Sequence, residues 1–307
     1  MIPGRVRVDL DSAKVLITGA RGFIGRHVVR RLHSLANIAL IEDRRPADRP
    51  GIDLLDRSAV QRLVNAGHIS HVVHACGSHP QRSAEDLFLV HAVATQNLLD
   101  ALANAGRVVR WINVGSAAQY GPQDRTTEPE LGEAHPDQAL SPYAASKAAQ
   151  EQLVASAAHH GLVQPTFLRV FNAIGPGQSA PLLVPAILDQ LHDPSTSVMR
   201  LGNLACVRDF IDVRDVADAI VACLQSAPTS GERLNVCSGS GTAVGEIAAL
   251  LVAAAGRDRA LRVVEVPMPS PAILYQRGSR RRIEALCGWR PRYALWETVR
   301  DIWAASP

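Results

Sequence analysis

The stretch Lys14-Val15-Leu16-Ile17-Thr18-Gly19-Ala20-Arg21-Gly22-Phe23-Ile24-Gly25 runs from an apolar strand through a glycine-rich turn into a helix. Its glycines are spaced G-x2-G-x2-G, so the first gap is one residue longer than in the G-x-G-x-x-G turn that binds dinucleotides. A turn of this kind brings the backbone close to a pyrophosphate and directs a helix N-terminus at the anion. A purely structural turn is the alternative, but the strand before it and the amphipathic helix after it favour a cofactor site.

The rest of the chain alternates predicted strands with predicted helices. Apolar strands are expected over 15–17, 38–41, 72–75, 108–114 and 166–171, and helices over 24–35, over 87–105 and from Ser141-Pro142 onward. Because such alternation forms parallel sheets covered on both faces, we predict an α/β fold with a doubly wound parallel sheet of the Rossmann type. After residue 171, repeated prolines divide the chain into shorter segments. We therefore predict a dinucleotide-binding domain over 1–171 and a smaller C-terminal lobe over 172–307, mainly substrate-binding, with segments near 203–240 returning to the main sheet.

Composition argues against several classes of protein. The 307 residues carry 32 basic and 29 acidic side chains, and the net charge of +3 is too small to indicate nucleic-acid binding. No apolar run reaches the ~18 residues that a membrane-spanning helix needs, and the first residues lack the apolar core of a signal peptide. The five cysteines form no CxxC pair, and His71 and His74 point to opposite faces of a strand. We therefore expect a cytoplasmic protein with reduced thiols and no metal site.

The segment Tyr143-Ala144-Ala145-Ser146-Lys147 supplies a phenol and an ammonium at positions i and i+4, which lie on one face of a helix. A free phenol has a pKa near ~10, too high for efficient proton exchange at neutral pH. We expect the Lys147 ammonium to lower the pKa of Tyr143. Ser116 ends a predicted strand at the edge where open α/β sheets bind ligands, and its hydroxyl can hydrogen-bond a substrate oxygen. Together with the dinucleotide turn, these residues indicate redox chemistry at a carbonyl or an alcohol.

Charged residues after the second predicted strand bear on the choice of cofactor. Asp43 lies about 20 residues beyond the turn, where a carboxylate binds the adenosine ribose, and this favours NAD(H). Glu42 is an alternative ribose ligand. Arg44 and Arg45 follow directly and can hold a 2′-phosphate, so NADP(H) stays open. The pair Asp53-Leu54 is a candidate for contact with the adenine ring.

Several long motifs follow one another in a recognisable order. They are Thr18 to Gly25, the trio Ser116, Tyr143 and Lys147, the segments 169–178 and 208–217, and the closing Cys287-Gly288-Trp289-Arg290-Pro291. With these motifs, nearly the whole chain resembles the extended short-chain dehydrogenase/reductase family of the NAD-dependent epimerase/dehydratase type, which acts on nucleotide sugars. Within that family, segments 172–178, 202–210, 235–239 and 277–279 are most similar to GDP-4-keto-6-deoxymannose reductases and related nucleotide-sugar 4-ketoreductases.

The resemblance implies a role for each matching residue. Tyr143 would donate a proton to the C4 ketone of an NDP-4-keto-6-deoxyhexose, Lys147 would tune Tyr143, and Ser116 would orient the ketone. Asn172 and Arg208 would contact the nucleotide diphosphate. The residues implied to bind the cofactor are Gly19, Gly22, Phe23, Ile24, Gly25, Tyr143 and Lys147.

A basic cluster near the C-terminus offers a further contact. Arg277, Arg280, Arg281 and Arg282 could clamp a diphosphate, because guanidinium groups match phosphate oxygens, or could form a solvated face. By the resemblance, Arg282 is the member of the cluster that would reach the substrate.

Departures from the family pattern narrow the reaction. Family dehydratases carry Asp and Glu directly after the strand-end Ser or Thr, where this chain has Ala117 and Ala118, which cannot transfer protons. Ala173 replaces a His that many of the reductases carry, His91 replaces the usual Asn, and Cys76 replaces a frequent Ala.

We therefore predict a nucleotide-sugar oxidoreductase that reduces the C4 ketone with hydride from NAD(P)H. An NAD-dependent nucleotide-sugar 4-epimerase needs the same trio and is the alternative. A non-enzymatic protein on this fold is the least favoured reading, since it could dispense with Tyr143 and Lys147. The Ala- and Leu-rich helices over 87–105 and 143–158 are candidates for a homodimer interface.

Overall fold

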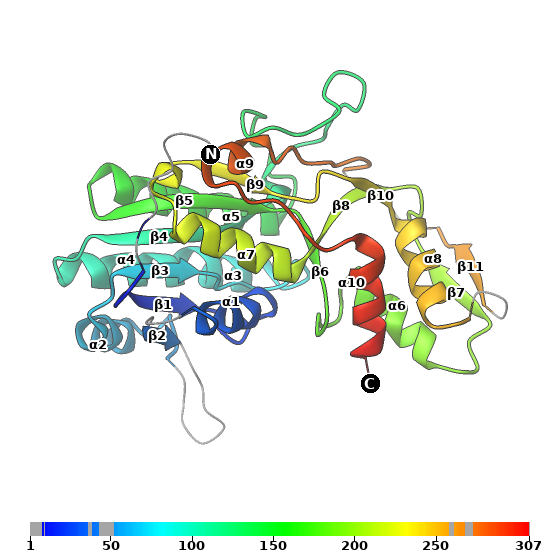
Figure 1. The fold of residues 1–307 in the computed structure, drawn as a ribbon, viewed down its shortest axis with the longest axis horizontal. Coiled ribbons are helices and arrows are strands. Elements are labelled where there is room, and N and C mark those ends of the chain that lie inside the picture. The colour runs from blue at the N-terminus through cyan, green and yellow to red at the C-terminus, as the bar shows by residue number, and fades with distance from the viewer. Residues whose placement is uncertain are drawn as a thin grey trace.

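The computed structural model describes residues 8, 10–35, 39–42, 52–257, 261–267 and 273–306. Its centre is a six-stranded sheet with the order β2-β1-β3-β4-β5-β9 (Figure 1), and every neighbouring pair in it is parallel. The strands are β1 (Lys14–Thr18), β2 (Ala39–Glu42), β3 (His71–His74), β4 (Val109–Ser116), β5 (Val163–Val170) and β9 (Arg233–Val236). This sheet confirms the predicted α/β class.

Helices cover both faces of this sheet. They are α1 (Phe23–His33) and α7 (Val213–Leu224) on one face, and α2 (Arg57–Gly67), α4 (Ala94–Asn104) and α5 (Pro142–His159) on the other. Alternation along β1 serves both layers, because Val15 and Ile17 pack into the core with α1 and α7 whereas Leu16 packs into the core with α2 and α4. Strands buried on both faces in this way read as continuous apolar runs.

The strand order changes direction between β1 and β3, which are both in the middle of the sheet. The chain leaves the carboxyl end of β1 toward α1 and the carboxyl end of β3 toward the opposite layer. The two connections diverge and leave a crevice at the sheet edge, which is where open α/β sheets bind ligands. The glycine turn after β1 borders this crevice.

The helix predicted over 87–105 is not a continuous α-helix. It comprises α3 (Ala84–Phe88), a π-helical turn η1 (Leu89–Val93) and α4. Ala94 donates its N–H to the carbonyl of Leu89, five residues back. The Thr95 hydroxyl donates to the carbonyl of His91 at 2.5 Å, so a side chain competes for a backbone acceptor. The apolar periodicity could not reveal this turn, because it arises from polar contacts of His91 and Thr95 with other segments.

A smaller part of the molecule lies beyond β5. It has a three-stranded sheet in the order β10-β8-β6 and a parallel pair β11-β7. Its strands are β6 (Asn172–Ile174), β7 (Val198–Leu201), β8 (Val207–Asp212), β10 (Gly241–Ala243) and β11 (Arg262–Glu265), and its helices are α6 (Leu183–His192), α8 (Val244–Ala254) and α10 (Leu295–Ala304). These elements share one apolar core that includes Ile187, Phe210, Leu251 and Ile302. Of the segments near 203–240, β9 is a strand of the large sheet and α7 packs on one face of that sheet, whereas β8 belongs to the small sheet.

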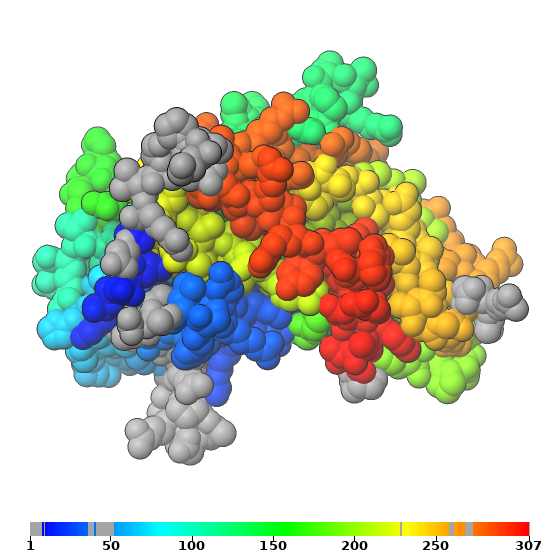
Figure 2. Space-filling model, viewed as in Figure 1, coloured from blue at the N-terminus to red at the C-terminus, as the bar shows by residue number. Residues whose placement is uncertain are grey.

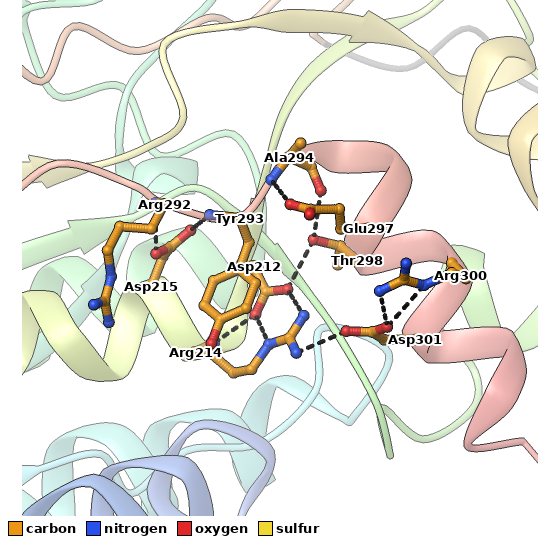
Figure 3. Close-up of polar contacts among 10 residues, drawn as sticks. All are labelled: Asp212, Arg214, Asp215, Arg292, Tyr293, Ala294, Glu297, Thr298, Arg300 and Asp301. Atoms are coloured by element: carbon orange, nitrogen blue, oxygen red, sulfur yellow. Dashed lines mark hydrogen bonds and ion pairs between the residues drawn. The ribbon is translucent and has the colours of Figure 1, made fainter.

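The C-terminal segment joins the two parts. Asp212 accepts the N–H of Arg214 at the start of α7, and it also accepts the hydroxyl of Thr298 on α10 at 2.7 Å. Arg214 donates to Asp212 at 2.6 Å and to Asp301 at 2.8 Å, so one guanidinium bridges β8 and α10 (Figure 3). In the space-filling view, the C-terminal residues, drawn in red, cover the surface between α1 and α8 (Figure 2). These contacts hold α10 against the point where β8 ends and α7 begins.

Candidate active site

The glycine turn has a geometry that only glycine permits. Gly19 has φ of +69°, and a Cβ there would lie 2.5 Å from the carbonyl oxygen of Ala75. A Cβ on Gly25 would lie 1.9 Å from the carbonyl oxygen of Gly19. Gly22 is the N-cap of α1 and supplies no side-chain acceptor, and the first turn of α1 contains no acidic residue. The first N–H groups of α1 therefore stay available to an anion, which fits the pyrophosphate of a dinucleotide.

A cleft with a volume of about 870 Å³ runs from this turn toward the smaller part of the molecule. Its lining includes Gly22, Phe23 and Ile24 of the turn and helix start, and the predicted trio Ser116, Tyr143 and Lys147. Residues 172–174, 182–184, 202–203, 206, 208 and 210 also line it. The cleft therefore brings the predicted trio together with the dinucleotide turn and the lobe predicted to bind substrate.

Local sequence places Tyr143 and Ser116 together. Ser141 is the N-cap of α5 and accepts the N–H of Ala144, and Pro142 occupies the first helical position. Tyr143 therefore projects from the first turn of α5, and its hydroxyl hydrogen-bonds Ser116 at the carboxyl end of β4. A substrate oxygen in the cleft could contact both hydroxyls at once.

Lys147 is buried behind Tyr143. Its Nζ donates to the carbonyl of Val114 and to Oε1 of Gln150, each at 3.0 Å. Burial lowers the pKa of Lys147 to about 8, although the nearby Cys76 thiol opposes the shift.

The expected fall in the pKa of Tyr143 is not observed. Burial raises the pKa of the Tyr143 phenol above its ordinary value, and the hydrogen bond with Ser116 only partly opposes this. The Lys147 ammonium donates to Val114 and Gln150 instead, and loss of solvent dominates the pKa of Tyr143. The phenol is consequently protonated at neutral pH, which is the form that a proton donor needs.

A buried chain of hydrogen bonds connects Lys147 to the glycine turn. Gln150 accepts from Lys147 and donates through Nε2 to the Thr95 hydroxyl at 3.4 Å. Thr95 Oγ1 lies 2.8 Å from Nε2 of His74, and Nδ1 of His74 lies 2.8 Å from Oγ1 of Thr18, directly before the turn. This chain of hydrogen bonds could not be predicted from the sequence, because its members come from β1, β3, α4 and α5 and share no local motif.

The partners of Thr95 assign the tautomer of His74. Because the Thr95 hydroxyl proton goes to the carbonyl of His91, the contact with His74 requires that Nε2 of His74 carry a proton. Nδ1 of His74 then accepts from the Thr18 hydroxyl. Burial, reinforced by the Lys147 charge, lowers the pKa of His74 to about 3, so the imidazole is neutral.

These buried imidazoles make stability depend on pH. Burial first, and then the Lys147 charge, also lowers the pKa of His91 to about 2. Between pH 7 and pH 5 the unfolded chain takes up protons at His74 and His91 while the folded protein does not. Acidification should therefore cost about 2 kcal/mol of folding free energy for each imidazole. Asp209, whose pKa burial raises to about 6, should offset about 1 kcal/mol of that loss.

Urea unfolding at the two pH values measures this effect. In His74→Gln the difference between pH 7 and pH 5 should be about 2 kcal/mol smaller than in the wild type. His68→Gln, at an exposed imidazole, is the matched control. An unchanged difference in His74→Gln would show that His74 is not held neutral by the fold.

Of the residues predicted to contact the nucleotide diphosphate, two lie at the cleft and Arg282 does not. Asn172 and Arg208 line the cleft. Arg208 donates to the carbonyl oxygens of Val207 and Ile273, and within the described ranges no ion pair is formed by its guanidinium. A half-buried cation in this state suits an anionic ligand.

The prediction for Arg282 is not supported by the geometry. Arg282 is outside the lining of the cleft, and its guanidinium pairs with Glu232. Arg277 and Arg281 both pair with Glu130, each at 3.1 Å. Three arginines of the basic cluster are therefore compensated by carboxylates from distant segments, a pairing that the local sequence could not reveal.

Of the residues predicted for the adenosine end of the cofactor, the described pair Asp53 and Leu54 does not line this cleft. Asp43, Arg44 and Arg45 lie outside the described residues, so the choice between NAD(H) and NADP(H) stays a prediction. Asp53 accepts the N–H of Leu55 in the turn before α2. Leu54 is buried in the core with α2 and α4. Their contact with adenine also stays a prediction.

Metal clusters and membrane-spanning helices are both absent from the described part of the chain. No group of three or more His, Cys, Asp or Glu side chains there could hold a metal ion. None of the helices found there has the length and apolarity that crossing a membrane requires.

Comparison with known proteins defines the class. The NAD dependent epimerase/dehydratase family matches residues 15–237, which span the glycine turn, the Ser116–Tyr143–Lys147 trio and β9. The chain belongs to this family. The match confirms the resemblance in the sequence and the dependence on a nicotinamide cofactor.

Individual relatives are more specific. The chain is 28% identical over 311 residues to the dTDP-6-deoxy-L-talose 4-dehydrogenase (NAD(P)(+)) of Kitasatospora kifunensis, with 96% of each chain covered. It is 27% identical to the GDP-6-deoxy-D-mannose reductase of Pseudomonas aeruginosa, covering 95% of this chain and 96% of the relative. The solved structure of RMD from Pseudomonas aeruginosa complexed with NADPH superposes with a TM-score of 0.85 at 26% identity, covering 95% and 98% of the two chains.

Proposed function

We propose that this protein is an NAD(P)H-dependent nucleotide-sugar 4-ketoreductase acting on an NDP-4-keto-6-deoxyhexose. The main support is the position of Tyr143 in the cleft beside Ser116, where Ser116 is followed by Ala117 and Ala118. A proton donor is present, and the carboxylates that a dehydratase needs at the two alanine positions are absent. The named relatives include enzymes that act at C4 of 6-deoxyhexose nucleotides.

The residues of the cleft divide the reaction between them. Gly19, Gly22 and Gly25 would hold the reduced cofactor, whose nicotinamide would supply the hydride for sugar C4. Ser116 orients the C4 oxygen by hydrogen bonding. As the carbonyl π bond breaks and charge develops on that oxygen, the O–H bond of Tyr143 breaks and its proton completes the hydroxyl. The Lys147 ammonium stabilises the phenolate left on Tyr143.

Arg208 should carry much of the affinity for the diphosphate. Arg208→Met keeps the apolar part of the side chain and removes the charge, so we expect KM for the nucleotide sugar to rise about 30-fold with kcat changed far less. Steady-state kinetics at saturating cofactor measure both constants. Arg200→Met, at an exposed arginine of β7, should leave KM unchanged. Equal KM values for Arg208→Met and the wild type would place the diphosphate elsewhere.

A substrate and cofactor panel tests the function itself. GDP- and dTDP-4-keto-6-deoxyhexoses are each incubated with NADH and with NADPH, while absorbance and the NMR spectrum of the sugar are followed. The proposal predicts stoichiometric loss of one reductant and a product with a hydroxyl at C4. The 4-epimerase stays the alternative because it uses the same trio. It would interconvert 4-hydroxy nucleotide sugars with no added reductant.

We also infer a cytoplasmic homodimer. The apolar side chains of Phe88 and Val93, each 40% exposed, lie at the two ends of the π-helical turn next to α4. Burying them against a second copy is favourable, and helical faces of this kind support symmetric dimers. Light scattering should give twice the 32.9 kDa of the chain, and Phe88→Glu should shift the protein toward the monomer. A wild-type monomer at micromolar concentration would refute the dimer.

A further inference from the structure

His91 lies in the π-helical turn and is fully buried beside the cleft. Its ring meets the ring of Tyr143 edge to face, with 5.6 Å between centroids. π-helical turns often occur at functional sites, where the extra residue changes the direction of a side chain. Here His91 comes to lie between the segment that follows β3 and the first turns of α5.

Both ring nitrogens of His91 have hydrogen-bond partners from those segments. Nε2 accepts the backbone N–H of Ser78 at 3.2 Å, so this nitrogen carries no proton. Nδ1 therefore carries the proton and donates to Oγ of Ser146 at 2.8 Å. Ser146 in turn donates to the carbonyl of Tyr143 at 2.9 Å. One neutral imidazole thus connects the backbone at Ser78 with the helical turn that carries Tyr143.

The segment 77–80 that His91 holds forms a wall of the cleft. Within this segment, the backbone of Gly77 lies close to His91 and Lys147. A Cβ on Gly77 would lie 3.4 Å from Nε2 of His91 and 3.7 Å from Nζ of Lys147. Further along, Gln81 reaches the carbonyl of Pro181 only at 3.5 Å, at the limit of a hydrogen bond. The strong attachment of this wall is therefore at its His91 end.

We propose that His91 is a positioning residue that fixes the cleft wall 77–80 relative to Tyr143. The inference rests on the proposed ketoreductase function, because the wall and the proton donor enclose the same substrate. His91 transfers no proton and touches no reacting atom. Its effect passes through the Ser78 amide, which sets the position of the wall.

Two amide variants separate the two contacts of the imidazole. The amide of Gln reaches about as far as Nε2 of histidine, so His91→Gln can still accept from the Ser78 N–H. The shorter Asn reaches only as far as Nδ1, so His91→Asn keeps the donor to Ser146 and loses the acceptor for Ser78. Both variants remain polar and smaller than histidine, so neither overpacks the core. His68→Asn makes the same substitution at an exposed site.

Amide hydrogen exchange and steady-state kinetics are measured on all four proteins. In His91→Asn we expect peptides covering 77–81 to exchange at least about fivefold faster, and KM for the nucleotide sugar to rise about fivefold with kcat within about twofold. His91→Gln and His68→Asn should match the wild type within about twofold in both measurements.

The outcomes distinguish the inference from the function on which it rests. Equal exchange over 77–81 in the wild type and His91→Asn would overturn the inference even in an active enzyme. So would equal losses in His91→Asn and His91→Gln, which would indicate general loosening of the core. A wild type without turnover on the sugar panel would refute the ketoreductase, and the expected rise in KM would lose its basis. The hydrogen-exchange result would still decide whether His91 fixes the cleft wall 77–80.

Discussion

Tyr143→Phe should lower kcat for reduction of the 4-keto sugar by about 10³-fold, within the range that general acid catalysis contributes. The substitution removes the proton donor and the hydrogen bond to Ser116 while keeping the aromatic ring that packs against His91. Because the ring is retained, the dissociation constant of NAD(P)H should change by no more than about twofold. Single-turnover kinetics and fluorescence titration of the reduced cofactor measure the two quantities.

Tyr293→Phe is the matched control for this experiment. Tyr293 packs against Arg214 at the C-terminal junction, outside the cleft, and should keep full turnover as phenylalanine. If Tyr143→Phe reduced the sugar at more than about a tenth of the wild-type rate, another group would be the proton donor and the proposed mechanism would be wrong.

Gly25→Ala should abolish cofactor binding. The added methyl would lie 1.9 Å from the carbonyl oxygen of Gly19 and 2.9 Å from Cα of Ala20. Both atoms belong to the backbone, so the turn must open before the methyl fits, and the N–H groups of α1 are displaced from the pyrophosphate. We expect an increase of at least about 100-fold in the dissociation constant of NAD(P)H and a loss of about 3 kcal/mol in folding free energy.

Gly132→Ala tests whether this effect is specific. A Cβ at Gly132 meets no atom within 4 Å, so both quantities should stay close to those of the wild type. Calorimetric titration and urea unfolding provide the measurements. Wild-type affinity in Gly25→Ala would mean that the dinucleotide does not bind at this turn.

Much of the large sheet could be predicted because its signals are local. Buried parallel strands are continuous apolar runs, and the strand before the glycine turn is predicted over 15–17 and observed over 14–18. The N-cap Ser141 and Pro142 likewise fixed the start of α5, since capping depends on neighbouring residues. The sequence could not show that η1 interrupts the next helix, because that turn depends on contacts of His91 and Thr95 with other elements.

For the candidate site, too, local features could be predicted from the sequence and features that depend on the complete fold could not. The trio Ser116, Tyr143 and Lys147 could be proposed from spacing and strand ends, and the structure brings all three to one cleft. The pKa of Tyr143 could not be predicted, because burial depends on the complete fold. The pairing of Arg282 with Glu232 depends on contacts between residues distant in sequence, for which a single sequence gives no signal.

The most direct test of the ketoreductase uses cofactor that carries deuterium at the transferable position of the reduced nicotinamide. The accepted 4-keto-6-deoxyhexose nucleotide is reduced, and the product is analysed by NMR. The account predicts one deuterium at sugar C4 for each cofactor oxidised. Unchanged 4-keto sugar with no deuterium and no oxidation of the cofactor, together with interconversion of 4-hydroxy nucleotide sugars in a parallel reaction, would contradict the reductase and identify an epimerase.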